Sequence, residues 1–300
     1  MDLQALADFN LVAAHGGFGR ASRITGRSKA TLSRRVAELE QSLGVRLIER
    51  GAHMLRLTEE GSALHERTEG LLDEITEAGE SIISGASIPR GRLRVSAPIV
   101  FAHVALSRIG ARFAQAFPQV DLEIVAEDKL VDPVDDDYDL VIRIDPAPDD
   151  RLVGRQILSD ERLLVASPAA RSPLAGSEAE EELRIKAVLT TATPSGTKWR
   201  VRTDASGVRL VHPEPILRLS SLLMVRDAVV AGAGASLLPK LLVADDLKAG
   251  RLVCWATDDN PPVAIWALQS SRRLVGAKVR AFLDVLAAAF PDKVFDPGRV

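Results

Sequence analysis

Apolar residues near the amino end repeat at the spacing of an amphipathic helix. The clearest repeat consists of Leu32, Val36, Leu39 and Leu43. Their spacing predicts a helix that begins after a Ser28 cap, ends at Gly44 and buries one narrow stripe. Two shorter helices are predicted before it. The first is capped by Asp2, with apolar positions at Leu3, Leu6, Phe9 and Ala13, and the second covers about 20–25. Segments 45–51 and 55–58 then form two short strand-like pieces around a turn, which predicts a β-wing.

A second helical repeat, with a period of seven, begins at Glu59, and Thr58 is placed to cap it. Its two rows are Leu64, Leu71 and Ala78, and Thr68, Ile75 and Ile82, with Leu72 and Ile83 widening them. This pattern predicts a coiled-coil seam of about three heptads that pairs two copies of the chain. The alternative is a helix that packs on its own domain. Residues 84–89 are expected to form a flexible hinge.

From Leu93 onward, strand-like and helical segments alternate. Strands are predicted at 93–96, 121–125, 139–143, 152–157, 163–166, 187–190 and 263–268, and helices at 98–117, 222–231, 241–248 and 275–290. This alternation is typical of an α/β domain with largely parallel sheets. The predicted fold class is α+β multidomain. It has an all-α winged helix-turn-helix head (1–58), a long linker helix and hinge (59–90) and an α/β body (91–300).

The charge distribution separates these three parts. The 300 residues carry a net charge of −3, of which the head contributes +4, the linker −6 and the body −1. The single cysteine, Cys254, excludes disulfides within the chain and cysteine-rich metal sites. No run of 18 apolar residues and no signal segment is present, so we expect a cytoplasmic protein that contacts no membrane.

The positive charge of the head is concentrated between Arg20 and Arg35. This stretch holds Arg20, Arg23, Arg27, Lys29, Arg34 and Arg35 and no acidic residue. One interpretation is a solvated basic helix, although solvated faces normally mix both signs of charge. The other is a helix that enters a DNA major groove about 12 Å wide, because its outer face carries small residues and hydrogen-bond donors.

The head closely resembles the winged helix-turn-helix of LysR-type transcriptional regulators. The matching residues are 17–22, 28–43, 43–50 and 55–61. The resemblance implies a DNA-binding set of Arg20, Ser28, Lys29, Ala30, Thr31, Ser33, Arg34, Arg35, Arg50, His53 and Thr58. Many members carry Gln-Pro after the cap serine, where this chain has Lys29-Ala30. Lysine pairs with guanine and glutamine with adenine, so a different base preference is expected there.

The body resembles the LysR effector domain, which is similar to periplasmic binding proteins. The residues that carry this resemblance are 93–98, 138–144, 231–239 and 247–252. It implies subdomain I over about 91–160 and 266–300, subdomain II over about 161–265, two chain crossings and a small-molecule effector in the cleft. The expected effector-binding set is Pro98, Ile99, Val100, Phe101, Arg143, Thr193, Ser195, Ser220, Ser221 and Ala235.

Several of these positions keep two interpretations open. Ser220 and Ser221 can bind a ligand or cap a helix, and Arg143 can pair with a ligand carboxylate or form a structural ion pair. The family often has a polar residue where Val100 stands in this chain, and Asn-Asp where Ser220-Ser221 stand. The substitutions reduce polarity, so we expect a ligand less highly charged than a di-acid.

Patterns typical of enzymes are lacking. The five histidines show no metal-ligand spacing, no Gly-x-Ser-x-Gly elbow is present, and Gly232-Ala233-Gly234 lacks the third glycine of a dinucleotide site. The sequence therefore predicts a regulator without cofactor, metal or catalytic residues, and its partners are promoter DNA, an effector and further copies of itself. The copies are expected to form a dimer and then a tetramer, and contact with RNA polymerase is possible. The alternative is a metabolite-binding protein or enzyme with an incidental basic helix.

Overall fold

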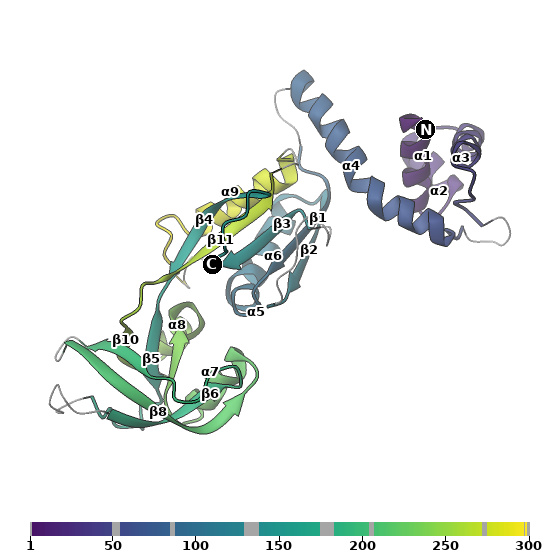
Figure 1. Ribbon diagram of the computed structural model, residues 1–300. Coiled ribbons are helices and arrows are strands. Elements are labelled where there is room, and N and C mark those ends of the chain that lie inside the picture. The colour runs from purple at the N-terminus through teal and green to yellow at the C-terminus, as the bar shows by residue number, and fades with distance from the viewer. Residues whose placement is uncertain are drawn as a thin grey trace. The chain divides into compact units, whose positions relative to one another are not determined.

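The computed structural model describes residues 2–49, 55–84, 88–128, 138–174, 183–203, 207–271, 275–296 and 298. For 73, 74 and 76–84 it describes the backbone alone, so Ala78, Ile82 and Ile83 cannot be compared with the predicted seam. Arg50, His53 and residues 85–87 of the expected hinge lie outside the described residues. The chain forms two compact units, Met1–Gly91 and Arg92–Val300 (Figure 1).

The first unit contains the predicted head helices and the linker helix. They are α1 (Leu3–Ala14), α2 (Phe18–Thr25), α3 (Lys29–Leu43) and α4 (Glu59–Ser84). The caps are confirmed, since an Asp2 carboxylate oxygen accepts from the Gln4 N–H at 2.8 Å and Ser28 Oγ accepts from the Thr31 N–H at 3.1 Å. Gly26 and Gly44 end α2 and α3 with φ of 71° and 72°, a left-handed conformation that glycine adopts without strain.

The predicted stripe of α3 forms the head core for three of its four members. Leu32, Val36 and Leu39 are buried beside Phe9 of α1. The prediction was wrong for Leu43, which is 37% exposed because it is the last residue of α3. Leu3, an apolar position of α1, is exposed at the first turn of that helix. The wing is present as an antiparallel bridge between Ile48 and Leu57.

The apolar residues of α4 do not form one seam. Leu64 and Leu72 pack against the head core, and Thr68 accepts a hydrogen bond from Asn10 at 2.9 Å. Leu71 and Ile75 point elsewhere and are 49% and 57% exposed. The expectation of one continuous dimer seam was therefore wrong, since part of the repeat is used within the chain. Pairing of two copies through the exposed residues of α4 stays a prediction.

The body has two sheets, the first with strand order β2-β1-β3-β11-β4. Its strands are β1 (Gly91–Ala97), β2 (Val120–Ala126), β3 (Leu140–Ile144), β4 (Leu152–Asp160) and β11 (Val263–Ser270). Helical segments pack on one face of this sheet: α5 (Ile99–Phe101), the π-helix η1 (Ala102–Leu106), α6 (Ser107–Ala116) and α9 (Ala277–Ala289). They bury the first core of the body.

The second sheet has the order β6-β8-β7-β10-β5-β9. Its strands are β5 (Arg162–Ala166), β6 (Leu183–Thr190), β7 (Trp199–Thr203), β8 (Gly207–Leu219), β9 (Ser236–Pro239) and β10 (Val253–Asp258). Helices α7 (Leu222–Val230) and α8 (Lys240–Lys248) pack on it. The strands β7, β8, β9 and β10 were not predicted from the sequence.

The expectation of largely parallel sheets was wrong. β1 pairs with β3 and β6 with β8 in parallel, whereas the pairs β11–β3, β11–β4, β7–β8, β10–β7, β10–β5 and β5–β9 are antiparallel. The reason is that β4 and β11 carry the chain out of the first sheet and back into it, so they run in opposite directions. β7 and β8 are consecutive along the chain and also pair directly.

The two crossings between the sheets lie next to each other. The chain leaves the first sheet after Asp160 and re-enters it at Val263, and these two residues are opposite one another in the β4–β11 ladder. Leu241 of α8 belongs to the first core, while Val100 and Val104 pack against the core that the second sheet forms with α7 and α8. Within the described part of the chain, no helix combines the length and apolar character needed to cross a membrane.

Candidate functional site

The outer face of α3 presents small and basic side chains to solvent. Lys29, Ala30, Ser33 and Arg34 are exposed, while Leu32 and Val36 on the opposite face are buried. The Arg34 guanidinium lies 2.8 Å from Glu38, but both side chains are at least half exposed. Exposed pairs of this kind contribute little to stability, so Arg34 can leave its partner at small cost.

A hollow of about 690 Å³ lies beside this face, between α2, α3 and the wing. Arg20, Arg23, Lys29 and Ser33 are among the residues that line it. Among the described residues, no acidic side chain forms an ion pair with any of these three cations. Glu40 and Glu49 also line the hollow, so its three cations outnumber its two acidic side chains. A concave surface with an excess of cations suits phosphate groups and base edges.

Three predicted residues are engaged in local caps. Ser28 and Thr31 hydrogen-bond to each other through their hydroxyls at 2.8 Å at the start of α3. Thr58 Oγ1 donates to the Arg46 carbonyl at 2.7 Å and accepts from the Gly61 N–H at 3.0 Å. Ser28 and Thr31 thus cap the start of α3, which carries the basic face, and Thr58 caps the start of α4 beside the wing.

Arg35, also in the predicted set, turns toward the interior of the head. Its guanidinium lies 3.0 Å from the carboxylate of Asp8, which is fully buried on α1. Arg27, from the turn before α3, pairs with the other oxygen of the same carboxylate. Sequence reasoning missed Asp8, although a carboxylate among the apolar positions Ala5, Phe9 and Val12 was a detectable signal.

Glu40 ties the wing to α3 and was also missed from the sequence. One oxygen of its carboxylate accepts the N–H groups of Leu47 at 2.8 Å and of Ile48 at 3.1 Å. Gly61 lies so close to the wing that a Cβ there would be 2.1 Å from the Leu47 carbonyl oxygen. Glu40 therefore holds the described base of the wing against α3, and Gly61 lets α4 approach the same segment closely.

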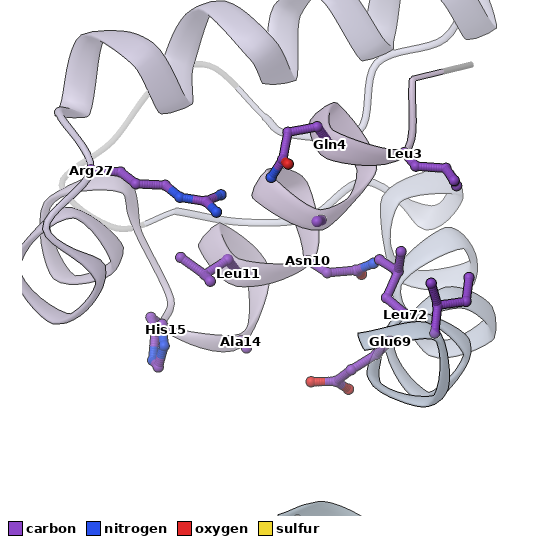
Figure 2. A pocket seen from close by; sticks show the side chains of 11 residues that line it. Leu3, Gln4, Asn10, Leu11, Ala14, His15, Arg27, Glu69 and Leu72 are labelled. Atoms are coloured by element: carbon purple, nitrogen blue, oxygen red, sulfur yellow. The ribbon is translucent and has the colours of Figure 1, made fainter. Parts of the chain in front are cut away.

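A polar cluster joins α1 to the linker helix. The Asn10 side-chain oxygen lies 2.6 Å from His65 Nδ1, and the amide nitrogen donates to Thr68 at 2.9 Å. Beside this cluster is a hollow of about 560 Å³ between α1 and α4 (Figure 2). Its lining includes Leu3 and Ile75, both more than half exposed. Exposed apolar side chains such as those of Leu3 and Ile75 can pack against another helix.

The body has a cavity of about 460 Å³ at the end of the second sheet. Predicted Thr193 lines it together with Arg162, Lys198 and Leu222. Thr193 and Thr190 share a hydroxyl hydrogen bond of 2.8 Å, and Arg218 donates to the Thr193 carbonyl at 3.0 Å. The loop after β6 is thus held in place, with polar groups lining the cavity.

None of the other predicted effector residues lines this cavity. Pro98, Ile99 and Val100 are half-buried after β1, and Ser195 and Ser220 are exposed in their loops. Ser221 caps α7 by accepting from the Leu223 N–H at 3.2 Å. Phe101 is buried in the first core, 5.9 Å from the Phe290 ring, and Ala235 is buried where its backbone bonds to β6. Phe101 and Ala235 therefore have packing roles.

Arg143 belongs to a polar network within the first sheet. Its Nη2 donates to Ser96 at 3.0 Å, and the Ser96 and Tyr138 hydroxyls both donate to the Glu127 carboxylate, at 3.0 and 2.8 Å. Burial lowers the pKa of Arg143, and the nearby charge of Glu127 opposes this shift. Of the two interpretations, the geometry favours structural pairing, here through Ser96.

The crossing between the sheets contains a buried carboxylate. Asp160 accepts from the Leu241 N–H of α8 at 3.0 Å, while its neighbour Glu161 pairs with Lys240 at 2.5 Å. Burial raises the pKa of Asp160 to about 7, against the opposing effect of the Leu241 hydrogen bond. Among the described residues, no cluster of His, Cys, Asp and Glu side chains is suited to hold a metal ion.

A winged helix-turn-helix unit joined to an α/β body with two sheets defines a one-component, ligand-responsive DNA-binding regulator. Two family models match the chain. Residues 3–62 match the bacterial regulatory helix-turn-helix protein of the lysR family, and residues 86–291 match the LysR substrate binding domain. The chain belongs to the LysR family of transcriptional regulators, and not to an enzyme family.

Similar proteins cover nearly the full chain. The HTH-type transcriptional regulator PtxR of Pseudomonas aeruginosa is 31% identical over 95% of this chain and 92% of its own length. DmlR of Escherichia coli is 29% identical over 97% and 95%. Full-length AphB of Vibrio cholerae (27% identity, TM-score 0.53) and CrgA of Neisseria meningitidis (25%, 0.58) each match 95% of this chain and 98% of their own.

Proposed function

We propose that this regulator binds double-stranded promoter DNA by laying the amino-terminal half of α3 in the major groove. The observation that carries the proposal is the division of α3 into a buried stripe and an exposed basic face. Lys29, Ala30, Ser33 and Arg34 read base edges or adjacent phosphates, Arg20 holds the backbone, and Ser28, Thr31 and Thr58 fix the geometry. Arg50 and His53 complete the contact from the wing.

The exposed apolar residues of α4 support a homodimer. Leu71 and Ile75 are too exposed to belong to the head core, and Ile75 and Leu3 line the hollow between α1 and α4. The linker helix of a second copy covers them, which places two copies of α3 on two half-sites. Body contacts then join two dimers into a tetramer.

The effector occupies the body, where the cavity beside Thr193 and the corners at 98–100 and 220–222 provide its binding groups. Val100, Ser220 and Ser221 are less polar than the residues that family members often carry at these positions, which supports a ligand less charged than a di-acid. The ligand shifts the angle between the subdomains because it binds one arrangement more tightly than the other. This shift changes the spacing of the heads, and with it the DNA bend and contact with RNA polymerase in the cytoplasm.

The salt dependence of DNA binding tests the proposal. The affinity of the wild type for a random duplex should fall steeply with salt, with a slope of about −0.9 for each phosphate contact. Arg34→Ala should reduce this slope by about one. Lys29→Ala should relax base preference at one position of a selected site.

A matched control is Arg184→Ala in the body, because Arg184 is also an exposed arginine paired with a glutamate. It should bind DNA like the wild type. A flat salt response of the wild type, or an unchanged footprint and slope for Arg34→Ala, contradicts the proposal. The flat response would favour a metabolite-binding protein whose basic helix is incidental.

A further inference from the structure

Two of the six cations of the basic segment are held by one buried carboxylate. Asp8 is fully buried on α1; its Oδ2 lies 3.0 Å from Arg35 Nη1, and its Oδ1 contacts Arg27. The two arginines come from the turn before α3 and from its second turn. Figure 2 shows the Arg27 guanidinium beside α1, on the side of the hollow between α1 and α4. Asp8 therefore ties α1 to two points on or beside α3, and these two contacts together fix where α3 lies and how it is rotated about its axis.

These pairs differ physically from the pair of Arg34 and Glu38. The side chains of Arg27 and Arg35 are 41% and 30% exposed, whereas that of Arg34 is 66% exposed. Glu38 is half exposed, so water solvates it when Arg34 moves to a phosphate. Asp8 has no such access to water. Removing its arginines would leave an uncompensated buried charge, which is strongly unfavourable.

We propose that Asp8 is a positioning and specificity-determining residue that withholds Arg27 and Arg35 from DNA phosphates. This inference rests on the proposed DNA-binding function of α3. Each cation kept from the backbone removes one contact that would strengthen binding to every sequence equally. Asp8 thus lowers non-specific binding, while it holds Ser33 and Arg34 at the angle needed for base contacts. The ratio of specific to non-specific affinity, which decides occupancy in a genome, rises in consequence.

The test compares salt slopes on a random duplex and on a site selected by the full-length wild-type protein. Asp8→Asn removes the buried charge and frees both arginines, so the slope on random duplex should steepen by up to about 2, at about 0.9 per arginine. The preference for the selected site should fall several-fold. Arg35→Met keeps the Arg27 pair and should leave the slope unchanged. A merely structural role of Asp8 weakens binding without steepening the slope.

The matched control is Asp246→Asn. Asp246 is likewise a fully buried carboxylate shared by two arginines, Arg226 and Arg251, but it lies in the body. Asp246→Asn should show the same salt slope on random duplex as the wild type. An unchanged or shallower slope for Asp8→Asn overturns the inference. A slope reduced by about one in Arg35→Met also overturns it, and this second variant decides the question if Asp8→Asn does not fold. A wild type that binds no DNA contradicts the proposed function itself, which is a distinguishable result.

Discussion

Replacement of Asp160 by asparagine should make the stability of the body less dependent on pH. Asp160 is buried at the chain crossing, and burial raises its pKa from 3.8 to about 7. Asparagine is neutral at every pH and keeps a side-chain oxygen that can accept from the Leu241 N–H. The substitution therefore removes the ionisation while the hydrogen bond to α8 is retained.

The magnitude follows from the size of the shift. A rise from 3.8 to about 7 corresponds to about 4 kcal/mol, since one pKa unit is roughly 1.4 kcal/mol. Because the folded-state pKa is raised, the contribution of Asp160 to stability is fully present below the unfolded-state pKa. It is lost as pH rises through about 7. Between about pH 5 and about pH 8 the expected loss is roughly 2–3 kcal/mol.

Urea unfolding followed by tryptophan fluorescence measures this effect, since all three tryptophans, at 199, 255 and 266, lie in the body. The difference in unfolding free energy between Asp160→Asn and the wild type should grow with pH in favour of the variant. Asp149→Asn is the control, because Arg151 lowers the pKa of that partly exposed carboxyl and it titrates only in acid. A difference that stays constant from about pH 5 to about pH 8, or that favours the wild type at high pH, would refute the reasoning.

Three further predictions concern the head, the body and the dimer. Gly61→Ala should weaken DNA binding and increase protease cleavage of the head, because the added Cβ would clash with the Leu47 carbonyl oxygen. The control is Gly70→Ala on the same helix, where a Cβ meets open space, and this substitution should stabilise the protein by about 1 kcal/mol. Arg226→Met should lower the unfolding free energy of the body by about 3 kcal/mol in the fluorescence assay, because the buried Asp246 loses two hydrogen bonds. The control is Arg184→Met, which removes an exposed ion pair and should change the unfolding free energy by less than about 0.5 kcal/mol. The double substitution of Leu71→Asp and Ile75→Asp should give monomers in sedimentation, while Ile24→Asp, at a still more exposed position on α2, should leave the dimer intact. Dimers in both cases would remove this face of α4 from the interface.

The head could be predicted from the sequence because local signals determine its elements. Ser28, Gly26 and Gly44 act on their own backbone, so the bounds of α3 follow from residues next to them. The strand β8 was missed for the same reason. Its Pro213 and Pro215 and its charged residues argue against a strand locally, and only pairing with β6 and β7 stabilises it.

Residue spacing alone could not show that α4 and the basic segment each contain residues with different roles. Leu64 and Leu71 occupy equivalent heptad positions, yet one packs on the head and the other is exposed, because α1 covers only part of the helix. Asp8 is 27 residues from Arg35, and nothing in the local pattern joins them. An apparently undiluted charge run was therefore partly neutralised by a residue from another helix.

The most direct test of the account places a DNA-cleaving chelate on α3. Ser33→Cys in a Cys254→Ser background gives one attachment point on the outer face of the helix, and Glu214→Cys in the same background gives a control on the body. On a duplex selected by the wild-type protein, the account predicts two clusters of cuts from position 33, one in each half-site, and no comparable cuts from position 214. Cutting from position 33 that is absent, or that does not exceed the control, would contradict the claim that α3 lies in the groove.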